Sequence, residues 1–239
     1  MIYVMSDIHG LYDRYLRMLD LISLKEDDTL YVLGDVIDRG PDGIAVLLDL
    51  MERKNAELFL GNHEHMMLMW MDGYDRVSWL MQENGGDRTL NALRALPKDA
   101  QKRILYYLRE QTHLVKHLKY PDHQLILSHT GVWLEGTDLD TKDVVYPSML
   151  EYVWNMGRYS LYQLPALKKT EYPTTLISGH IITRYMTMAD KDEIVQRDYW
   201  NGYSYIDIDC GCAMGAYRGK LACLKINDAG KIEDVLYTE

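Results

Sequence analysis

The chain has 239 residues, of which 47% are hydrophobic and 26% charged, a composition that excludes a wholly disordered protein. Its formal net charge of −10 argues against a nucleic-acid-coating role, because such a role needs a basic face. The N-terminus MIYVMSDIHG lacks a basic lead and a long apolar core, and no run reaches the roughly 18 apolar residues that span a bilayer. We therefore expect no signal peptide, no membrane partner and no nucleic-acid partner.

Short apolar runs that fit buried strands alternate with helical patterns, which favours an α/β architecture. In chain order, the sequence predicts strands over residues 2–5, 30–33, 58–60, 125–127 and 176–177. Apolar residues on one helical face predict helices over about 11–22 and 44–51, and residues from about 64 to 120 have a mainly helical pattern. Residues 203–209 and 220–226 alternate like antiparallel strands around a Gly-rich turn. We expect a single domain over residues 1–239 with a helical insertion or cap at about 65–120.

Polar residues follow five of the predicted strands at the point where each strand ends. They are Asp7, His9, Asp35, Asn62, His63, His129 and His180. A single Asp or His at such a place is usually a turn or helix cap. Here four of the eight histidines occupy strand ends, and the carboxyl ends of strands gather at one crevice in open α/β sheets. The pattern predicts a metal site whose oxygen and nitrogen donors suit Mn, Fe or Zn better than Mg alone.

Other residues of these types receive structural interpretations. Core packing is favoured over metal binding for Cys210 and Cys212, which we expect on one face of a strand. Together with Cys223 they do not resemble a disulfide framework, so a reducing cytoplasm is the expected location. Structural roles are also favoured for the other histidines and for a helical methionine cluster, with a flexible substrate wall as the alternative for the methionines: His65, His113, His117, His123, Met66, Met67, Met69 and Met71.

Three motifs occur in order along the first third of the chain. Residues 7–10 (DIHG), 34–40 (GDVIDRG) and 61–64 (GNHE) resemble the three signatures of the calcineurin-like metallophosphoesterases. Residues 83–86 (ENGG) and 153–155 (VWN) are similar to stretches of the small bacterial and phage serine/threonine phosphatases. The resemblance implies an α/β fold of four layers, α-β-β-α, with two mixed β-sheets flanked by helices.

The resemblance also implies two metal ions and assigns their ligands by position. Asp7 and His9 would hold the first ion, and Asp35 would bridge both. The second ion would be held by Asn62, His129 and His180. The family usually has Gly or Ala after the histidine that corresponds to His129, whereas this chain has Thr130; we expect the change to alter the floor of the pocket and to leave ligation intact.

Two metals can clamp the attacking and leaving oxygens of an in-line displacement, and they lower the pKa of a shared water. The bridging hydroxide would attack phosphorus directly. His63 is then the candidate general acid, and Asp38 would orient its ring and keep it protonated. Arg39 is expected to grip phosphate oxygens with two parallel donors. Arg158 is the nearest candidate for a second such arginine, although two extra residues separate it from Trp-Asn, and a plain surface role is the alternative.

We predict a phosphatase that hydrolyses phosphomonoesters, with phosphoserine or phosphothreonine in proteins as substrate and Mn as the favoured metal in vitro. The alternative is a symmetric bis(5'-nucleosyl)-tetraphosphatase, a diadenosine tetraphosphate hydrolase on the same fold. Those enzymes tend to carry Ala in place of Asp38 and Asp in place of Glu64, so these two residues favour the phosphatase. A non-catalytic binding module is a third interpretation, but none of the six predicted ligands is missing.

Overall fold

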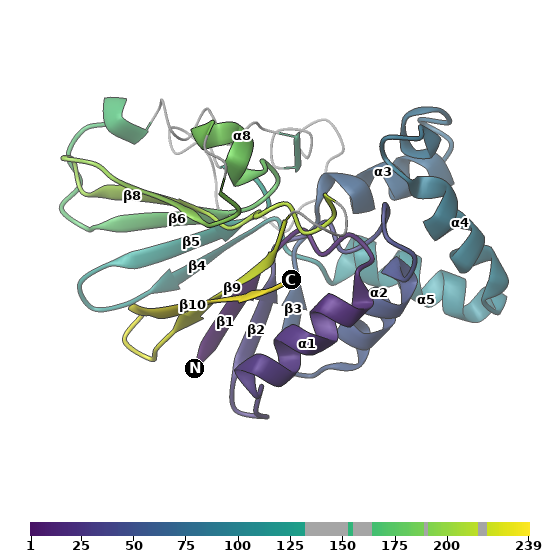
Figure 1. Ribbon diagram of the computed structural model, residues 1–239, viewed down its shortest axis with the longest axis horizontal. Coiled ribbons are helices and arrows are strands. Elements are labelled where there is room, and N and C mark those ends of the chain that lie inside the picture. Colours follow the sequence, from purple (N-terminus) through teal and green to yellow (C-terminus); the bar gives the residue numbers. More distant parts are fainter. Residues whose placement is uncertain (132–152, 155–163, 189–190, 215–218) are drawn as a thin grey trace.

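The computed structural model describes residues 1–131, 153–154, 164–188, 191–214 and 219–239. Ten strands within these residues form two five-stranded sheets (Figure 1). The first sheet has the order β10-β9-β1-β2-β3. Its strands are β1 (Ile2–Met5), β2 (Thr29–Val32), β3 (Ala56–Leu58), β9 (Leu221–Ile226) and β10 (Ile232–Thr238). It is mixed, because β1 to β3 are parallel and β9 runs antiparallel to both β1 and β10.

The second sheet has the order β4-β5-β6-β8-β7 and is also mixed. Its strands are β4 (Val115–Lys119), β5 (Gln124–Ser128), β6 (Thr174–Ser178), β7 (Val195–Asp198) and β8 (Tyr203–Asp207). The three central strands β5, β6 and β8 are parallel, and the two edge strands are antiparallel to their neighbours. Each sheet thus contains three parallel strands whose carboxyl ends can bring side chains together.

Helices cover the outer faces of the two sheets (Figure 1). The helices of the described residues are α1 (Tyr12–Ile22), α2 (Gly43–Glu52), α3 (Asn62–Met71), α4 (Gly86–Ala95), α5 (Lys98–Glu110) and α8 (Thr183–Thr187), with 3-10 turns η1 (Ser78–Leu80) and η2 (Leu164–Ala166). Helices α1 and α2 lie outside the first sheet, and α8 lies outside the second. The predicted four-layer α/β sandwich of two mixed sheets flanked by helices is confirmed.

The alternation of side chains along each strand separates the apolar core into layers. Val4 and Leu33 lie in the cluster between the sheets, together with Ile177 from the second sheet. The neighbours of Val4, Tyr3 and Met5, lie in a second cluster that packs under α1 and α2. Fully burying a side chain of this size stabilises the fold by about 1.5–3 kcal/mol. The two clusters therefore hold the sheets together beneath the loops at their ends.

The helical segment α3 to α5 lies at one end of the molecule, on the right in Figure 1. Its buried residues Met67, Trp79 and Ile104 belong to the same apolar cluster as α1 and α2. This shared core supports the prediction of a single domain with a helical insertion. The last helix of this segment, α5, ends at Glu110, so the predicted helical range of about 65–120 extends too far.

Three strands were not predicted: β4, β7 and β10. The residues of β4 were expected to be helical. Residues Val115–Lys119 pair antiparallel with β5, because the chain reverses at Pro121 and Asp122 into a tight hairpin closed by the Tyr120 N–H and the His123 carbonyl. The expectation for Cys210 and Cys212 was also wrong in part, since both are buried but follow the end of β8.

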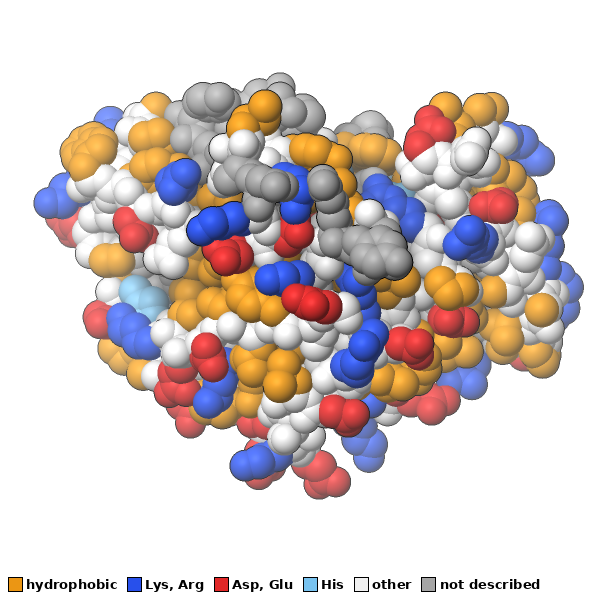
Figure 2. All heavy atoms as spheres, in the orientation of Figure 1, with side chains coloured by type: hydrophobic (Ala, Val, Ile, Leu, Met, Phe, Trp, Pro, Cys, Tyr) orange, Lys and Arg blue, Asp and Glu red, His pale blue; other side chains and the backbone are white. Residues whose placement is uncertain are grey.

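Charged side chains of both signs are interspersed over the face of the molecule shown in Figure 2. Among the described residues, no helix has the length and apolar character to cross a membrane.

Candidate active site

Most of the predicted site residues lie in loops whose backbone is held in an unusual conformation. Six of them have positive φ, from 49° to 73°: Asp7, His9, Asp35, Asp38, Arg39 and His180. A non-glycine residue in this region costs about 1–3 kcal/mol and persists only where the surroundings enforce it. Neighbouring loops do so here, since Asp7 N–H donates to the Gly34 carbonyl at 3.1 Å and His9 N–H to the Asp35 carbonyl at 2.9 Å.

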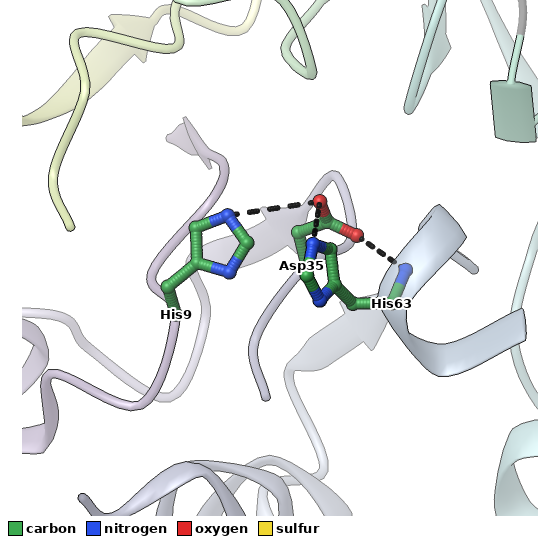
Figure 3. A group of neighbouring side chains, drawn as sticks. All are labelled: His9, Asp35 and His63. Atoms are coloured by element: carbon green, nitrogen blue, oxygen red, sulfur yellow. Dashed lines mark hydrogen bonds and ion pairs between the residues drawn. The ribbon is translucent and has the colours of Figure 1, made fainter. Parts of the chain in front are cut away.

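A first compact group of possible metal-binding atoms consists of His9, Asp35 and His63 (Figure 3). Oδ2 of Asp35 lies 3.7 Å from His9 Nε2 and 3.9 Å from His63 Nε2. The backbone N–H of His63 donates to the other oxygen, Oδ1, at 3.0 Å. Asp35 of the second motif therefore lies between His9 of the first motif and His63, the residue after Asn62 at the start of α3.

A second compact group consists of Asp35, His129 and His180. His129 Nε2 lies 3.5 Å from Asp35 Oδ1 and 3.0 Å from the side-chain oxygen of Asn62. His180 Nδ1 lies 2.9 Å from the same Asn62 oxygen. The two oxygens of Asp35 therefore face different sets of ring nitrogens, so that Asp35 could contribute to two neighbouring metal sites.

Two histidines of these groups, His9 and His129, present unprotonated nitrogens. Nδ1 of His9 donates to the Ile37 carbonyl at 3.2 Å, and Nδ1 of His129 donates to the Leu33 carbonyl at 2.6 Å. A carbonyl only accepts, so these bonds assign the proton to Nδ1 and leave Nε2 free to bind a metal. Burial lowers the pKa of His9 and His129, and lowers that of His180 to about 3. Neutral imidazole, carboxylate and amide oxygen are a donor set that fits Mn, Fe or Zn.

Asp7 lies beside these groups but belongs to neither. Its Oδ2 accepts hydrogen bonds from the Ser6 hydroxyl and, at 3.0 Å, from the backbone N–H of His180. Asp7 therefore connects the end of β1 to the end of β6. The structure brings five of the six predicted ligands together and places Asp7 next to them, with His63 inside the first group instead.

The Asp38 carboxylate is fully buried and makes hydrogen bonds through both oxygens. Oδ2 accepts from His63 Nδ1 and from Trp79 Nε1, each at 2.8 Å, and Oδ1 accepts from Thr89 Oγ1 at 2.6 Å. Burial alone would lower the pKa of His63, but Asp35 and Asp38 outweigh burial and raise it. Trp79 and Thr89 were missed from the sequence, where nothing marks them among the helical residues around them.

Arg39 points into the cluster rather than out to solvent. Its Nη1 lies 2.6 Å from His9 Nε2 and its Nη2 lies 3.2 Å from His63 Nε2. Gly85 packs against its backbone; a Cβ there would lie 2.6 Å from the Arg39 nitrogen, and the glycine has a φ of +72°. The ENGG stretch of the insertion thus supports the loop that carries Arg39. Arg158 lies outside the described residues.

Glu64 supports the loop of the second motif from below. Its buried carboxylate accepts backbone N–H groups from Asp35, Val36 and Ile37 at 2.8–3.3 Å, and from Gly61 at 3.0 Å. Burial and the charge of Asp35 raise the pKa of Glu64 to about 7, against the stabilising effect of these donors. Glu64 therefore connects the start of α3 to the loop of the second motif.

A cavity of about 210 Å³ opens beside the His9 side of the cluster. Charged and aromatic groups at its wall are His9, Arg39, Glu83 and Asp209, and the remainder is formed by Ile182 and the segment 211–214. Asp209 was not singled out from the sequence. The pattern that located the other site residues, a polar residue just after a strand, also applies to Asp209, because it follows β8, which is parallel to β6.

Comparison with known proteins supports the resemblance. The profile of the calcineurin-like phosphoesterase family matches residues 1–184. A curated relative from Haemophilus ducreyi, named symmetrical bis(5'-nucleosyl)-tetraphosphatase, is 31% identical over 58% of this chain and 47% of its own length. A protein of that name from Aliivibrio fischeri is 28% identical over 78% of this chain and 65% of its own. The chain spans about half the length of the first curated relatives it matches.

Solved structures agree on the fold. A metallophosphoesterase from Sphaerobacter thermophilus superposes with a TM-score of 0.57 at 16% identity, covering 100% of this chain and 88% of that one. A cold-active protein-tyrosine phosphatase of Shewanella gives 0.56 at 19% identity over 97% and 79%. With the family profile covering more than half of its residues, the chain belongs to the calcineurin-like phosphoesterases.

Proposed function

We propose that the protein is a metal-dependent hydrolase of phosphoric esters with a two-metal centre. The observation that carries this proposal is Asp35, whose Oδ2 faces His9 and whose Oδ1 faces His129. Asp7, His9 and Asp35 would hold the first ion. The second would be held by Asp35, Asn62, His129 and His180. We expect Mn to serve in vitro, with Fe or Zn as possible occupants in the cell.

Two bound ions would supply the attacking hydroxide and offset the charge that develops on the phosphate. The chain's own residues would do the rest. Arg39 reaches the cluster with two parallel N–H groups, which suits the recognition of two phosphate oxygens; Arg158 stays the candidate for a second phosphate-binding arginine. His63, hydrogen-bonded to Asp38, would donate the proton that a leaving alkoxide needs.

A phosphomonoester with an alkoxide leaving group is the first candidate substrate, as in phosphoserine or phosphothreonine of a protein. The His63–Asp38 pair supports it. An alkoxide is a poor leaving group and gains most from a proton donor, whereas a diphosphate leaves as a stable anion.

A symmetrical dinucleoside tetraphosphate is the second candidate. The names of the curated relatives support it, and these comparisons favour it over a phosphoprotein. We assign the reaction to the cytoplasm, as expected for a chain with three free cysteines.

The test is a comparison of phosphopeptides with diadenosine tetraphosphate on Mn-reconstituted protein, with analysis of the products. Release of orthophosphate from the peptides at the higher kcat/KM supports the phosphomonoesterase. Symmetric cleavage to two nucleoside diphosphates with negligible peptide turnover establishes the second candidate. Hydrolysis of neither substrate class, or equal hydrolysis by Asp35→Asn, would overturn the proposal.

A further inference from the structure

Asp209 follows the last of six strands that end at the site, three parallel strands in each sheet. The loops after β1, β2 and β3 deliver Asp7 and His9, Asp35, and Asn62, and those after β5 and β6 deliver His129 and His180. Strand β8 is the sixth, parallel to β6, and Asp209 comes two residues after its end. By position in the fold, Asp209 is therefore equivalent to residues that the proposed function uses as ligands.

The Asp209 side chain is only 4% exposed, yet it lies at the wall of the cavity that it shares with His9 and Arg39. Its Oδ1 accepts the Gly211 N–H at 2.9 Å, and its own backbone is fixed by bonds with Asp207 and Thr183. Its Oδ2 has no hydrogen-bond partner among the described residues. A carboxylate oxygen at the wall of a cavity can accept a hydrogen bond from a water or contact a cation that enters the cavity.

The charges around Asp209 indicate which kind of group its Oδ2 would contact. Asp209 and Asp7 both adjoin the end of β6: the N–H of Ile208, next to Asp209, donates to the Ser178 carbonyl at 2.9 Å, and Asp7 Oδ2 accepts the His180 N–H at 3.0 Å. Arg39 is the one Lys or Arg among the described residues that line the cavity, and its guanidinium already contacts His9 and His63. Two neighbouring carboxylates beside His9 repel each other unless a cation lies between them.

We propose that Asp209 is a positioning residue of the first metal ion, accepting through Oδ2 a hydrogen bond from a water ligand of that ion. The inference rests on the metal assignment of the proposed function. The proposed function already assigns Asp7, His9 and Asp35 to the first ion, and Asp209 belongs to neither compact group of metal-binding atoms, so we place it one water molecule away from the ion. A role in holding phosphate is opposed by its charge, which repels phosphate oxygens.

The test is Mn²⁺ binding, measured from the electron paramagnetic resonance signal of the free ion. Asp209→Asn keeps an oxygen for the Gly211 N–H and removes the charge. We expect one of two Mn²⁺ ions to bind about 10–100-fold more weakly, as for other residues that orient metal ligands. Asp192→Asn is the matched control, because Asp192 accepts the Gly219 N–H at the far end of the same loop and pairs with Arg184; its Mn²⁺ affinity should equal that of the wild type.

Thermal unfolding separates positioning from a merely structural role. Without metal, Asp209→Asn should unfold at or above the wild-type temperature, because a repulsion with Asp7 is removed. With Mn²⁺ it should gain less stability than the wild type, since tighter binding to the folded state stabilises more. Wild-type Mn²⁺ affinity in Asp209→Asn, or a lower unfolding temperature without metal, would overturn the inference.

Neither Mn²⁺ binding nor thermal unfolding requires the protein to hydrolyse a substrate. A wild-type protein that binds two Mn²⁺ ions but hydrolyses no phosphoester would overturn the proposed function and leave this inference standing. A wild-type protein that binds no Mn²⁺ would overturn both.

Discussion

Two histidine–carboxylate pairs of nearly equal length lie in different regions of this protein. His63 Nδ1 lies 2.8 Å from Asp38 in the candidate active site, and His113 Nε2 lies 2.7 Å from Glu57 at the edge of the first sheet. The side chains of the first pair are 1% and 0% exposed, and those of the second are 19% and 33% exposed. The pairs share one chemistry and differ in surroundings.

The surroundings decide what each pair can do. Trp79 and Thr89 complete the hydrogen bonds of Asp38, while the other nitrogen of His63 faces Arg39 and Asp35. Glu57 instead pairs with Lys116 on β4 as well as with His113. The second pair therefore connects the edges of the two sheets. A short His–carboxylate distance is thus no sign of catalysis unless the free ring nitrogen faces a reaction site.

Removing the first histidine should have the largest effect. His63→Ala is expected to lower kcat for an alkyl phosphomonoester by about 10²–10⁴-fold, because the leaving alkoxide loses its proton donor. Metal content should not change, and His113→Ala should keep wild-type kcat. Metal analysis beside steady-state kinetics checks this; loss of metal would instead make His63 a ligand, as its place in the first group allows.

Changing the carboxylate should move the pH dependence. Asp38 raises the pKa of His63, so Asp38→Asn lowers it, and the protonated ring is lost at a lower pH. We expect kcat to fall on the order of 10²-fold, with the alkaline limb of its pH profile displaced toward acid. Glu57→Gln should leave the profile in place. An unshifted limb in Asp38→Asn would contradict the assignment of that limb to His63.

Removing one donor from Asp38 should have a smaller effect. Trp79→Phe keeps the buried ring and deletes the indole N–H that binds Asp38 Oδ2. Hydrogen bonds to charged groups contribute about 1.5–3 kcal/mol, so the free energy of unfolding should fall by up to that amount and kcat less than in Asp38→Asn. Urea unfolding and kinetics at one pH measure both. Unchanged values of both would show that Thr89 and His63 suffice to hold Asp38.

The smallest effect is expected at the second pair. His113, followed by Lys116, lowers the pKa of Glu57 to about 2, against the opposing effect of burial. A depressed carboxyl pKa stabilises the fold above the unfolded pKa of about 4.3, and this is lost as pH falls toward 2. Because a third of the side chain is exposed, Glu57→Gln should cost only about 0.2–1 kcal/mol at pH 7 and less at pH 2, where Glu57 is partly protonated. Urea unfolding at both values tests this, and a change in kcat would contradict it.

Much of the site could be predicted because strand ends are marked in the sequence. A short apolar run, then one or two small residues and an Asp, Asn or His, located the ends of five strands and all the predicted ligands. Asp209 escaped because it lies in an alternating stretch, Tyr203–Asp209, where Asp207 reads as the outward face of a strand. The partners of Asp38 escaped for another reason: Trp79 and Thr89 reach it only through the packing of the insertion against the second motif.

The three strands that were not predicted form because they pair with a neighbouring strand, and their own residue patterns do not mark them as strands. Strand β10 has an irregular register with β9 between Ile232 and Asp234, which disrupts strict alternation. Strand β7 is mostly exposed and pairs only along an edge. Strand β4 follows a helix directly, so its Val-Lys-His-Leu-Lys pattern is ambiguous until β5 fixes it.

The positive φ angles of six site residues bear on how this protein would respond to directed evolution. Glycine or asparagine adopts that backbone with less strain, so replacing Asp7 or His180 could recover part of the roughly 1–3 kcal/mol that each holds. A screen that rewards heat tolerance alone would enrich such replacements and yield sturdy, inert variants. A library intended for a robust catalyst therefore needs turnover scored in every round, and these loops kept constant.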